Sequence, residues 1–302
     1  MRIFSSDGSG KADPVVIGNQ HCIDKNKNTI LQAVMGFFLQ SGAESVMIIQ
    51  KRLTEPDTAG GSMKIRFLGT SFGAPSPGRH QQSILLETRN GDKYLVDTGA
   101  PVLDILVNEG YDLTRIRAVF ITHLHGDHMS GLIDILNLAA YFRIRCDVYL
   151  PEQRGIEAFE SFSEMMTSVR NVPGITYRLI GEGDFYDDGN LQVKSVQTDH
   201  MTKPCYGFLL CADQAKVYIT GDLHPSLRDF PSFLYEEATD MIVTECAHFT
   251  PEELYAKLQQ CSTKTAAVIH VMPEGKYAGL MEGAADMPMS VVFPADGDNY
   301  SF

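Results

Sequence analysis

The segment that most constrains this chain is Thr-His-Leu-His-Gly-Asp-His at residues 122–128. An apolar run at 118–121 leads directly into it and predicts a buried strand. Residues 129–136 behind it predict the start of a helix. Three histidines and one aspartate are therefore expected in a strand-to-helix loop, where a rigid scaffold can aim functional side chains.

The spacing within this loop indicates a metal site. His123 and His125 are two residues apart, so in an extended segment they point the same way. Gly126 permits a sharp turn, after which Asp127 and His128 can point toward a second ion. One tetrahedral ion needs only three protein ligands and a water, so four ligands here, with more downstream, predict two ions. An ordinary polar loop is the weaker alternative, because histidines this close repel when charged and gain little when neutral.

His-x-His-x-Asp-His after a strand resembles the signature of the metallo-β-lactamase superfamily. The resemblance implies an α+β fold, a four-layer αββα sandwich with a dinuclear site at the sheet edges. The order of predicted elements agrees, because two halves each contain strands followed by helices. Superfamily members hydrolyse lactams, thioesters, phosphodiesters or RNA, so the fold alone does not name a substrate.

The same resemblance implies the remaining metal ligands. His200 follows a strand predicted at 191–196, Asp222 ends a strand at 216–220, and His270 ends a strand at 266–269. A carboxylate has two oxygens, so Asp222 can bridge two cations. For any single histidine, a surface loop position remains the alternative. The implied set is His123, His125 and His200 on one ion, Asp127, His128 and His270 on the other, and Asp222 between them.

Other polar residues are expected near this set. Asp97 matches the superfamily's early aspartate, which supports the ligands without binding metal. His224 is expected at the surface or behind the ligands. Glu245 and His248 follow a strand at 241–244 and could overhang the site. His248 could protonate a leaving group or be a loop histidine without chemistry, and both readings stay open. The predicted catalytic residues are Asp127 and His248.

The implied cofactors are two divalent cations. Nitrogen and carboxylate ligands suit Zn²⁺, with Mn²⁺ or Fe²⁺ as alternatives, because selectivity often follows availability. Two cations roughly 3.5–4 Å apart can hold a water and lower its pKa toward neutrality. The bridging hydroxide so formed is the expected nucleophile.

Three segments resemble the branch that contains tRNA 3′-processing endonucleases and small phosphodiesterases: residues 67–70, 123–128 and 220–222. Two features depart from the endonucleases. Their His-Glu-Ala-Thr motif would place histidine at Thr244, and between residues 150 and 200 we predict one helix and two strands without a basic arm. We therefore predict a dinuclear phosphodiesterase, with a tRNA 3′-processing endonuclease as the alternative. A non-catalytic metal-binding or interaction protein is the alternative from another class, and the complete ligand set argues against it.

The composition limits the kinds of partner that the chain can be expected to bind. The formal net charge is −13, which disfavours non-specific binding to nucleic acid. A small-molecule ester is therefore the predicted substrate, although a local basic groove for nucleic acid is compatible with this charge. No apolar run has the length of a membrane span, and no secretory signal is evident. The six cysteines form no Cys-x-x-Cys pair. These features predict a cytoplasmic protein without a membrane partner, and a homodimer is compatible with the sequence.

Two regions are predicted. Residues 1–62 form an N-terminal extension of unknown role, with an apolar helix expected at 29–39, and residues 63–302 form the hydrolase domain. Thr-Ala-Gly-Gly-Ser at 58–62 reads as a linker. A hairpin is expected around Asn90-Gly91. A helix at 153–170 carries an apolar stripe that we predict to be core: Ile156, Phe159, Phe162 and Met166.

Overall fold

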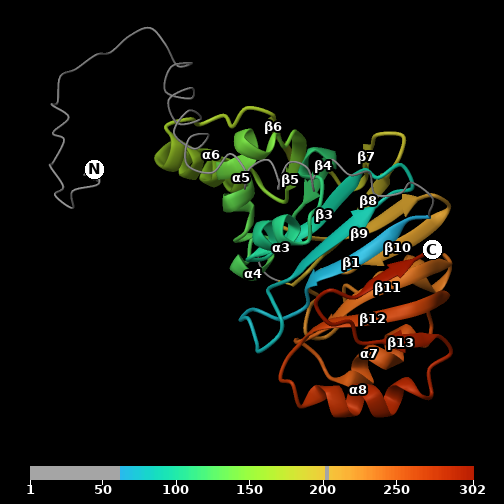
Figure 1. The fold of residues 1–302 in the computed structure, drawn as a ribbon. Coiled ribbons are helices and arrows are strands. Elements are labelled where there is room, and N and C mark those ends of the chain that lie inside the picture. Colours follow the sequence, from blue (N-terminus) through green and yellow to red (C-terminus); the bar gives the residue numbers. More distant parts are fainter. Residues whose placement is uncertain (1–61, 201–203) are drawn as a thin grey trace, which may run out of the picture. The chain divides into compact units, whose positions relative to one another are not determined.

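The computed structural model describes residues 62–200 and 204–302 (Figure 1). The helix predicted at 29–39 lies outside these residues, and the division at residue 62 stays a prediction. Two seven-stranded sheets form the framework. One has the strand order β14-β1-β2-β3-β4-β5-β6 and the other β13-β12-β11-β10-β9-β8-β7. Helices cover the outer faces of both sheets, which confirms the predicted αββα sandwich.

The elements follow one another in two successions, one for each half of the sandwich. The first comprises β1 (Lys64–Gly69), β2 (Ser83–Glu87), β3 (Lys93–Thr98), α3 (Val102–Asn108), β4 (Ile116–Phe120), α4 (Gly126–Met129), α5 (Leu132–Phe142), β5 (Cys146–Leu150), α6 (Gln153–Thr167) and β6 (Ile175–Leu179). The second comprises β7 (Gly183–Asp187), β8 (Gln192–Thr198), β9 (Cys205–Ala212), β10 (Ala215–Ile219), β11 (Thr239–Cys246), α7 (Pro251–Leu258), β12 (Thr263–Val271), α8 (Lys276–Ala284), β13 (Ser290–Val292) and β14 (Asn299–Ser301).

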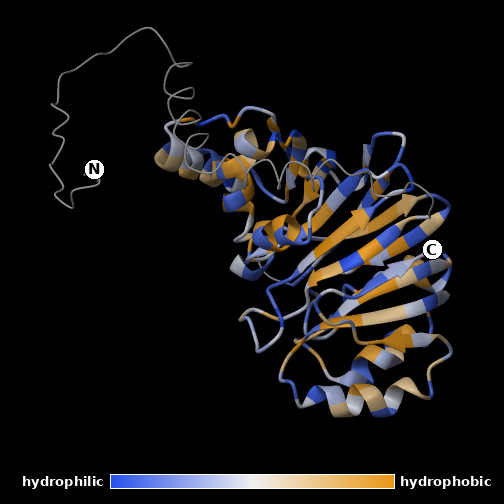
Figure 2. Ribbon diagram, viewed as in Figure 1, coloured by the Kyte–Doolittle hydropathy of each residue, from blue (hydrophilic) through white to orange (hydrophobic). Residues whose placement is uncertain are grey.

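Three apolar clusters fill the spaces between the four layers. The central cluster joins the inner faces of the two sheets, with Phe67 and Phe120 from one and Phe208 from the other. A second lies between the first sheet and helices α3, α5 and α6, and a third between the second sheet and α7 and α8. Both faces of the central strands are therefore covered, which explains their continuous apolar runs (Figure 2).

The strand directions bring the polar loops to one edge. β3, β4 and β5 run parallel, and so do β10, β11 and β12. The carboxyl ends of parallel strands meet at the same edge of a sheet. The loops that follow β4, β8 and β10, and the end of β12, carry the predicted ligands, so the fold gathers them at the edges of both sheets.

Local sequence signals account for several elements. The hairpin at Asn90-Gly91 joins β2 to β3 as predicted, and Gly91 has a φ of 81°. The β9–β10 hairpin turns at Asp213 and Gln214, both with positive φ. Helix α7 begins with a capping box in which Thr250 and Glu253 each accept the other's backbone N–H.

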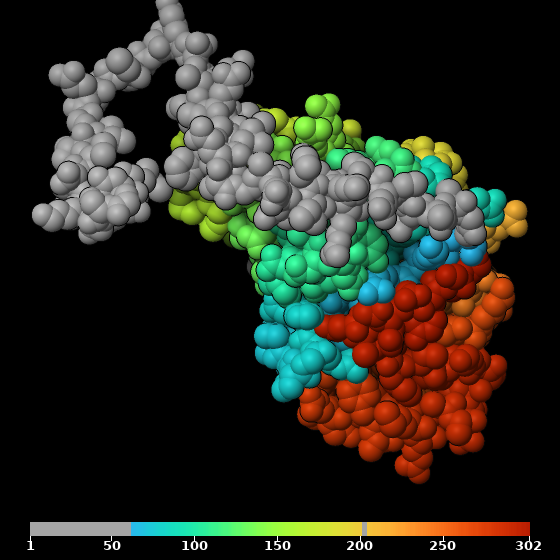
Figure 3. Space-filling model, in the orientation of Figure 1, coloured from blue at the N-terminus to red at the C-terminus, as the bar shows by residue number. Residues whose placement is uncertain are grey.

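Some predictions fail. The predicted two strands between residues 150 and 200 are three, because β7 was missed, and α8 and β14 were also missed. β14 pairs with β1, and Figure 3 shows the C-terminal segment lying against β1. Ile156 and Phe159 are buried as predicted, but Phe162 and Met166 are 40 % and 37 % exposed. The stripe on α6 is wider than the surface that α5 and β5 cover, so its outer residues are not core.

The cysteines within the described residues are free thiols. Cys146, Cys205, Cys246 and Cys261 are buried, Cys211 is half-buried, and none of these five forms a disulfide. Among the described residues, no helix has both the length and the apolar character that a membrane crossing requires.

Candidate metal centre

The loop at 121–128 is fixed between the two sheets. On the first sheet, the Ile121 N–H donates to the Tyr149 carbonyl at 3.0 Å. From the second, the Tyr206 N–H donates to the Thr122 carbonyl, also at 3.0 Å. Helix α4 then begins at Gly126, and the His128 N–H donates to the His125 carbonyl at 3.1 Å. These bonds turn the chain where the sequence placed Gly126 and aim Asp127 and His128 inward.

The first group of converging side chains comes from three loops, which follow β4, β8 and β10. His125 Nδ1 lies 2.9 Å from His123 Nε2 and 3.4 Å from His200 Nε2. Asp222 Oδ2 lies 3.9 Å from His123 Nε2 and 3.6 Å from His200 Nε2. One potential ligand atom from each of these four residues lies within 4.8 Å of the others.

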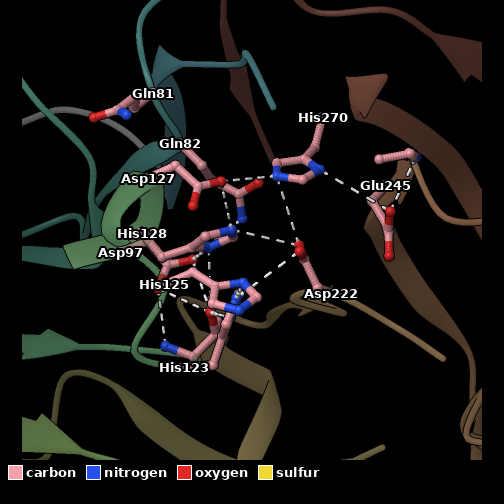
Figure 4. Close-up of polar contacts among 12 residues, drawn as sticks. Gln81, Gln82, Asp97, His123, His125, Asp127, His128, Asp222, Glu245 and His270 are labelled. Carbon is pink, nitrogen blue, oxygen red and sulfur yellow. Dashed lines mark hydrogen bonds and ion pairs between the residues drawn. The ribbon is translucent and has the colours of Figure 1, made fainter. Parts of the chain in front are cut away.

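The second group lies beside the first (Figure 4). Asp127 Oδ2 is 3.3 Å from His128 Nε2 and 3.2 Å from His270 Nε2. Asp222 Oδ1 is 3.5 Å from His128 Nε2 and 3.8 Å from His270 Nε2. The two oxygens of Asp222 therefore face different groups, which is the arrangement required of a bridging carboxylate.

The residues fit metal ions on two counts. Nitrogen ligands about 2.0–2.1 Å from a tetrahedral zinc lie about 3.3–3.4 Å apart, close to the separations among these histidines. His128 Nε2 and Asp222 Oδ1 are also buried without a hydrogen-bond partner. A buried polar atom without a partner is costly, and a cation would satisfy both. All seven residues that the sequence proposed as ligands are in these two groups.

The ionisation of the groups is consistent with cation binding. Burial lowers the pKa of His123 well below its usual value, and repulsion from His128 adds to this. Burial also lowers the pKa of His125 and His200, so all three imidazoles keep a free lone pair at neutral pH. Burial opposes ionisation of Asp127, but the adjacent imidazoles of His128 and His270 outweigh it and hold the carboxyl pKa well below its usual range.

In contrast to the first three imidazoles, the two imidazoles beside Asp222 have raised pKa values. Burial opposes ionisation of Asp222, but His270 and His128 lower the pKa of its carboxyl. Burial likewise opposes charge on His128 and His270, but Asp222 is the main influence that raises the pKa of both imidazoles. The negative charge of Asp222 is thus the dominant attraction for positive charge on either side.

Asp97 orients His128 from behind, as the sequence predicted. It is fully buried at the end of β3, and its Oδ2 lies 2.8 Å from His128 Nδ1. A hydrogen bond from Nδ1–H to this carboxylate leaves the Nε2 lone pair pointing at the second group. Asp97 also accepts the Thr122 N–H at 2.8 Å and the Gln82 Nε2–H at 3.2 Å. Gln82 carried no sequence signal, because its role appears only when β2 is placed beside β3.

Glu245 and His248 lie above both groups. Glu245 Oε2 and Oε1 lie 2.7 and 2.8 Å from His248 Nδ1. The ring centroid of His248 is 4.5 Å from that of His200 and 6.2 Å from that of His270. Burial lowers the pKa of His248, but the hydrogen bond and the charge of Glu245 outweigh it and raise the pKa. His224, by contrast, belongs to neither group and bonds Ser226 at 2.8 Å.

Tight backbone geometry surrounds the centre. Asp97 and His270 have φ values of 57° and 51°, which are uncommon for residues with a side chain. Gly221, beside Asp222, has a φ of 60°, and a Cβ there would lie 2.9 Å from the Tyr206 carbonyl oxygen and 3.1 Å from Thr122 Cβ. Positive φ at functional residues indicates strain that the surrounding structure maintains.

Comparisons with known proteins place this geometry in context. A ribonuclease Z from Shouchella clausii is 31 % identical over 142 residues, which are 46 % of this chain and 45 % of that protein. A ribonuclease BN from Proteus mirabilis is 28 % identical over 163 residues, 53 % of each chain. The match to these curated relatives spans about half of their length.

Two solved structures share the fold. The metallo-β-lactamase fold protein YhfI from Bacillus subtilis superposes with a TM-score of 0.66 at 19 % identity, covering 80 % of this chain and 99 % of that one. The short form of human tRNase Z superposes with a TM-score of 0.62 at 21 % identity, covering 79 % and 98 %. The fold is therefore the metallo-β-lactamase fold that the sequence predicted.

A family model decides the closer relationship. The model described as "Anti-Pycsar protein Apyc1" matches residues 63–285, which is most of the chain and includes all seven candidate ligands. The chain therefore belongs to the Anti-Pycsar protein Apyc1 family.

Proposed function

We propose that this protein is a hydrolase of phosphodiesters that works with two divalent cations, zinc being the first candidate. The observation that carries the proposal is the placement of Asp222, whose two carboxylate oxygens face two separate sets of ligand atoms. Bound there, two divalent cations would polarise the phosphodiester and provide a nucleophile at neutral pH. The names of the curated relatives, ribonuclease Z and ribonuclease BN, support phosphodiester chemistry.

The protein's own side chains would divide the remaining work. The three neutral imidazoles of His123, His125 and His200 would hold one cation, and Asp127, His128 and His270 the other. His248 would protonate the leaving-group oxygen. Glu245 holds its Nδ1, whereas its Nε2 has no hydrogen-bond partner within the described part of the chain, so Nε2 is the atom available to the substrate.

We favour a small phosphodiester over precursor tRNA. The described residues from 150 to 200 form α6, β6, β7 and β8, which all belong to the sandwich, so this stretch offers no separate arm for RNA. The formal net charge of −13 also opposes the approach of a polyanion. The relatives' names keep the RNA reading as the second candidate.

Two substitutions test the site. Asp222→Ala removes the shared ligand, so it should abolish turnover of every phosphodiester and reduce the metal content. His248→Ala should keep its metal and lose about 10²–10⁴-fold on a poor leaving group, the usual contribution of a general acid. It should recover on nitrophenyl phosphodiesters, whose leaving group needs no proton.

His224→Ala is the matched control, because it removes a nearby histidine from outside both groups. Elemental analysis should find close to two ions per chain in the unaltered protein. Full metal and near-normal rates in Asp222→Ala would contradict the ligand assignment. Equal losses of His248→Ala on both leaving groups would contradict its role as an acid.

A substrate comparison tests the ranking. At moderate salt, kcat/KM should be higher for a small phosphodiester than for a precursor tRNA. Efficient cleavage of the tRNA with negligible turnover of the small ester would reverse the order and favour the endonuclease.

A further inference from the structure

One lysine outside the metal groups makes an unusual set of bonds. Lys276 Nζ donates to the Cys246 carbonyl at 3.0 Å, the Ala247 carbonyl at 2.8 Å and the Phe249 carbonyl at 2.7 Å. An ammonium group has three N–H donors, and here each donor reaches a separate backbone carbonyl. The carbonyls belong to the last residue of β11, Cys246, and to the loop after it, which carries His248.

The same loop is held from its other side by Glu245. Oε2 of Glu245 accepts the Ala247 N–H at 2.9 Å and the His248 N–H at 3.2 Å. The Cys246 carbonyl and the Ala247 N–H are two ends of one peptide unit, and the Ala247 carbonyl and the His248 N–H are two ends of the next. Each of these two planar units is therefore bound by a carboxylate at one end and an ammonium at the other. Charge-assisted hydrogen bonds at both ends restrict the rotation of each peptide unit.

Both charged groups have fixed positions. Glu245 is buried at the end of β11, and its Oε1 also accepts the Leu223 N–H at 2.8 Å. Lys276 is the first residue of α8, which the Tyr255 hydroxyl ties to α7 through the Leu280 carbonyl. A cation in the first turn opposes the helix dipole, so helix stability does not explain a lysine at this position. The three carbonyl acceptors explain why a lysine stands at this position.

We propose that Lys276 is a positioning residue: together with Glu245 it clamps the 246–249 loop so that the His248 imidazole stays above the two ligand groups. The function of the clamp rests on the proposed role of His248. Lys276 itself need not touch the substrate. It acts on catalysis through the loop backbone, and Glu245 acts both on this backbone and directly on the His248 ring.

Lys276→Met tests the clamp, because methionine keeps an unbranched side chain and loses the three donors. A misplacement of about 1 Å can cost about 10²-fold in rate. We expect kcat on a phosphodiester with a poor leaving group to fall about 10²-fold, with a much smaller loss on a nitrophenyl phosphodiester and unchanged metal content. In the His248→Ala background, Lys276→Met should cost little more, because the group it positions is gone.

The matched control is Lys264→Met. It removes a lysine that pairs with Asp240 at 2.7 Å at the start of β12, and its side chain is 80 % exposed. This variant should leave rates and leaving-group dependence unchanged. Thermal unfolding of both variants will show that each is folded.

Hydrogen exchange gives a readout that does not depend on turnover. The amides of Ala247 and His248 should exchange faster in Lys276→Met than in Lys264→Met or the unaltered protein. Unchanged exchange, loss of metal, or full additivity with His248→Ala would each overturn the clamp. If exchange accelerates while neither Lys276→Met nor His248→Ala alters any rate, catalytic positioning is overturned, and the fault lies in the proposed role of His248.

Discussion

Asp97→Asn offers a direct measure of how the protein prepares a ligand. Asparagine has nearly the volume of aspartate, so the buried site at the end of β3 can hold it without a cavity. The amide oxygen of the asparagine can still accept the Thr122 N–H, which lies 2.8 Å from Asp97 Oδ1 in the unaltered protein. The NH₂ group of the asparagine takes the place of Oδ2, which lies 2.8 Å from His128 Nδ1 in the unaltered protein.

This exchange reverses the hydrogen bond to His128. An NH₂ donor requires Nδ1 to be the acceptor, so the neutral ring carries its proton on Nε2, the atom that faces Asp127 and Asp222. A protonated Nε2 has no lone pair for a cation. Loss of such a supporting partner typically costs 10–100-fold in metal affinity, which is about 1.4–2.8 kcal/mol. The Gln82 donor also loses its acceptor, which adds about 1–3 kcal/mol to the loss of stability.

Zinc titration against a competing chelator measures both sites. We expect Asp97→Asn to weaken one ion about 10–100-fold and leave the other nearly unchanged, because Asp97 bonds only His128 among the seven residues. Asp92→Asn is the matched control. Asp92 is a buried carboxylate on the β2–β3 hairpin, and its Oδ1 accepts a hydrogen bond from Arg117 Nε at 2.7 Å. This substitution should lower the melting temperature without changing either affinity. Equal weakening of both ions by Asp97→Asn, or of neither, would refute the tautomer argument.

Two further predictions concern the backbone and the boundary of the domain. Gly221→Ala should lower the free energy of unfolding by about 1–2 kcal/mol, because alanine disfavours the left-handed backbone. The contact of its Cβ with the Tyr206 carbonyl should lower it further. The variant should also bind less metal, because the substitution shifts Asp222. Gly189→Ala is the control, because Gly189 has a φ of 85° and open space where a Cβ would lie. Thermal unfolding and elemental analysis of the two variants should show only the backbone cost in Gly189→Ala. A chain that begins at Met63 should unfold cooperatively in calorimetry and bind as much metal as the full chain. An insoluble or non-cooperative product would assign residues before 63 to the core.

The sequence predicts which side chains converge because the candidate ligands follow strands. Asp222 and His270 come shortly after apolar runs that indicate buried strands, and the strand directions then bring both to one edge. The His-x-His-x-Asp-His spacing adds a local signal that does not depend on the rest of the fold. These two kinds of pattern, period and spacing, can be read from a single sequence.

The failures have a common physical cause. β7 and β14 are short and mostly half-exposed or exposed, so they lack an apolar period, and their pairing with β8 and β1 is decided by the tertiary fold. Phe162 has the helical spacing of a core residue, but burial depends on what lies opposite. The bonds from Lys276 to the loop at 246–249 join segments about 30 residues apart through backbone carbonyls, which leave no mark on the sequence.

The order of the ligands along the chain has a consequence for synthesis. His123, His125, Asp127 and His128 are made first, and His270 is made 142 residues after His128. At a typical elongation rate of about 5–20 residues per second, the first four ligands wait about 7–28 s for the last. During that interval the ribosome-bound chain contains these four side chains while the second sheet is still incomplete. The metal that occupies the finished centre can thus be influenced by which cation the nascent chain meets first.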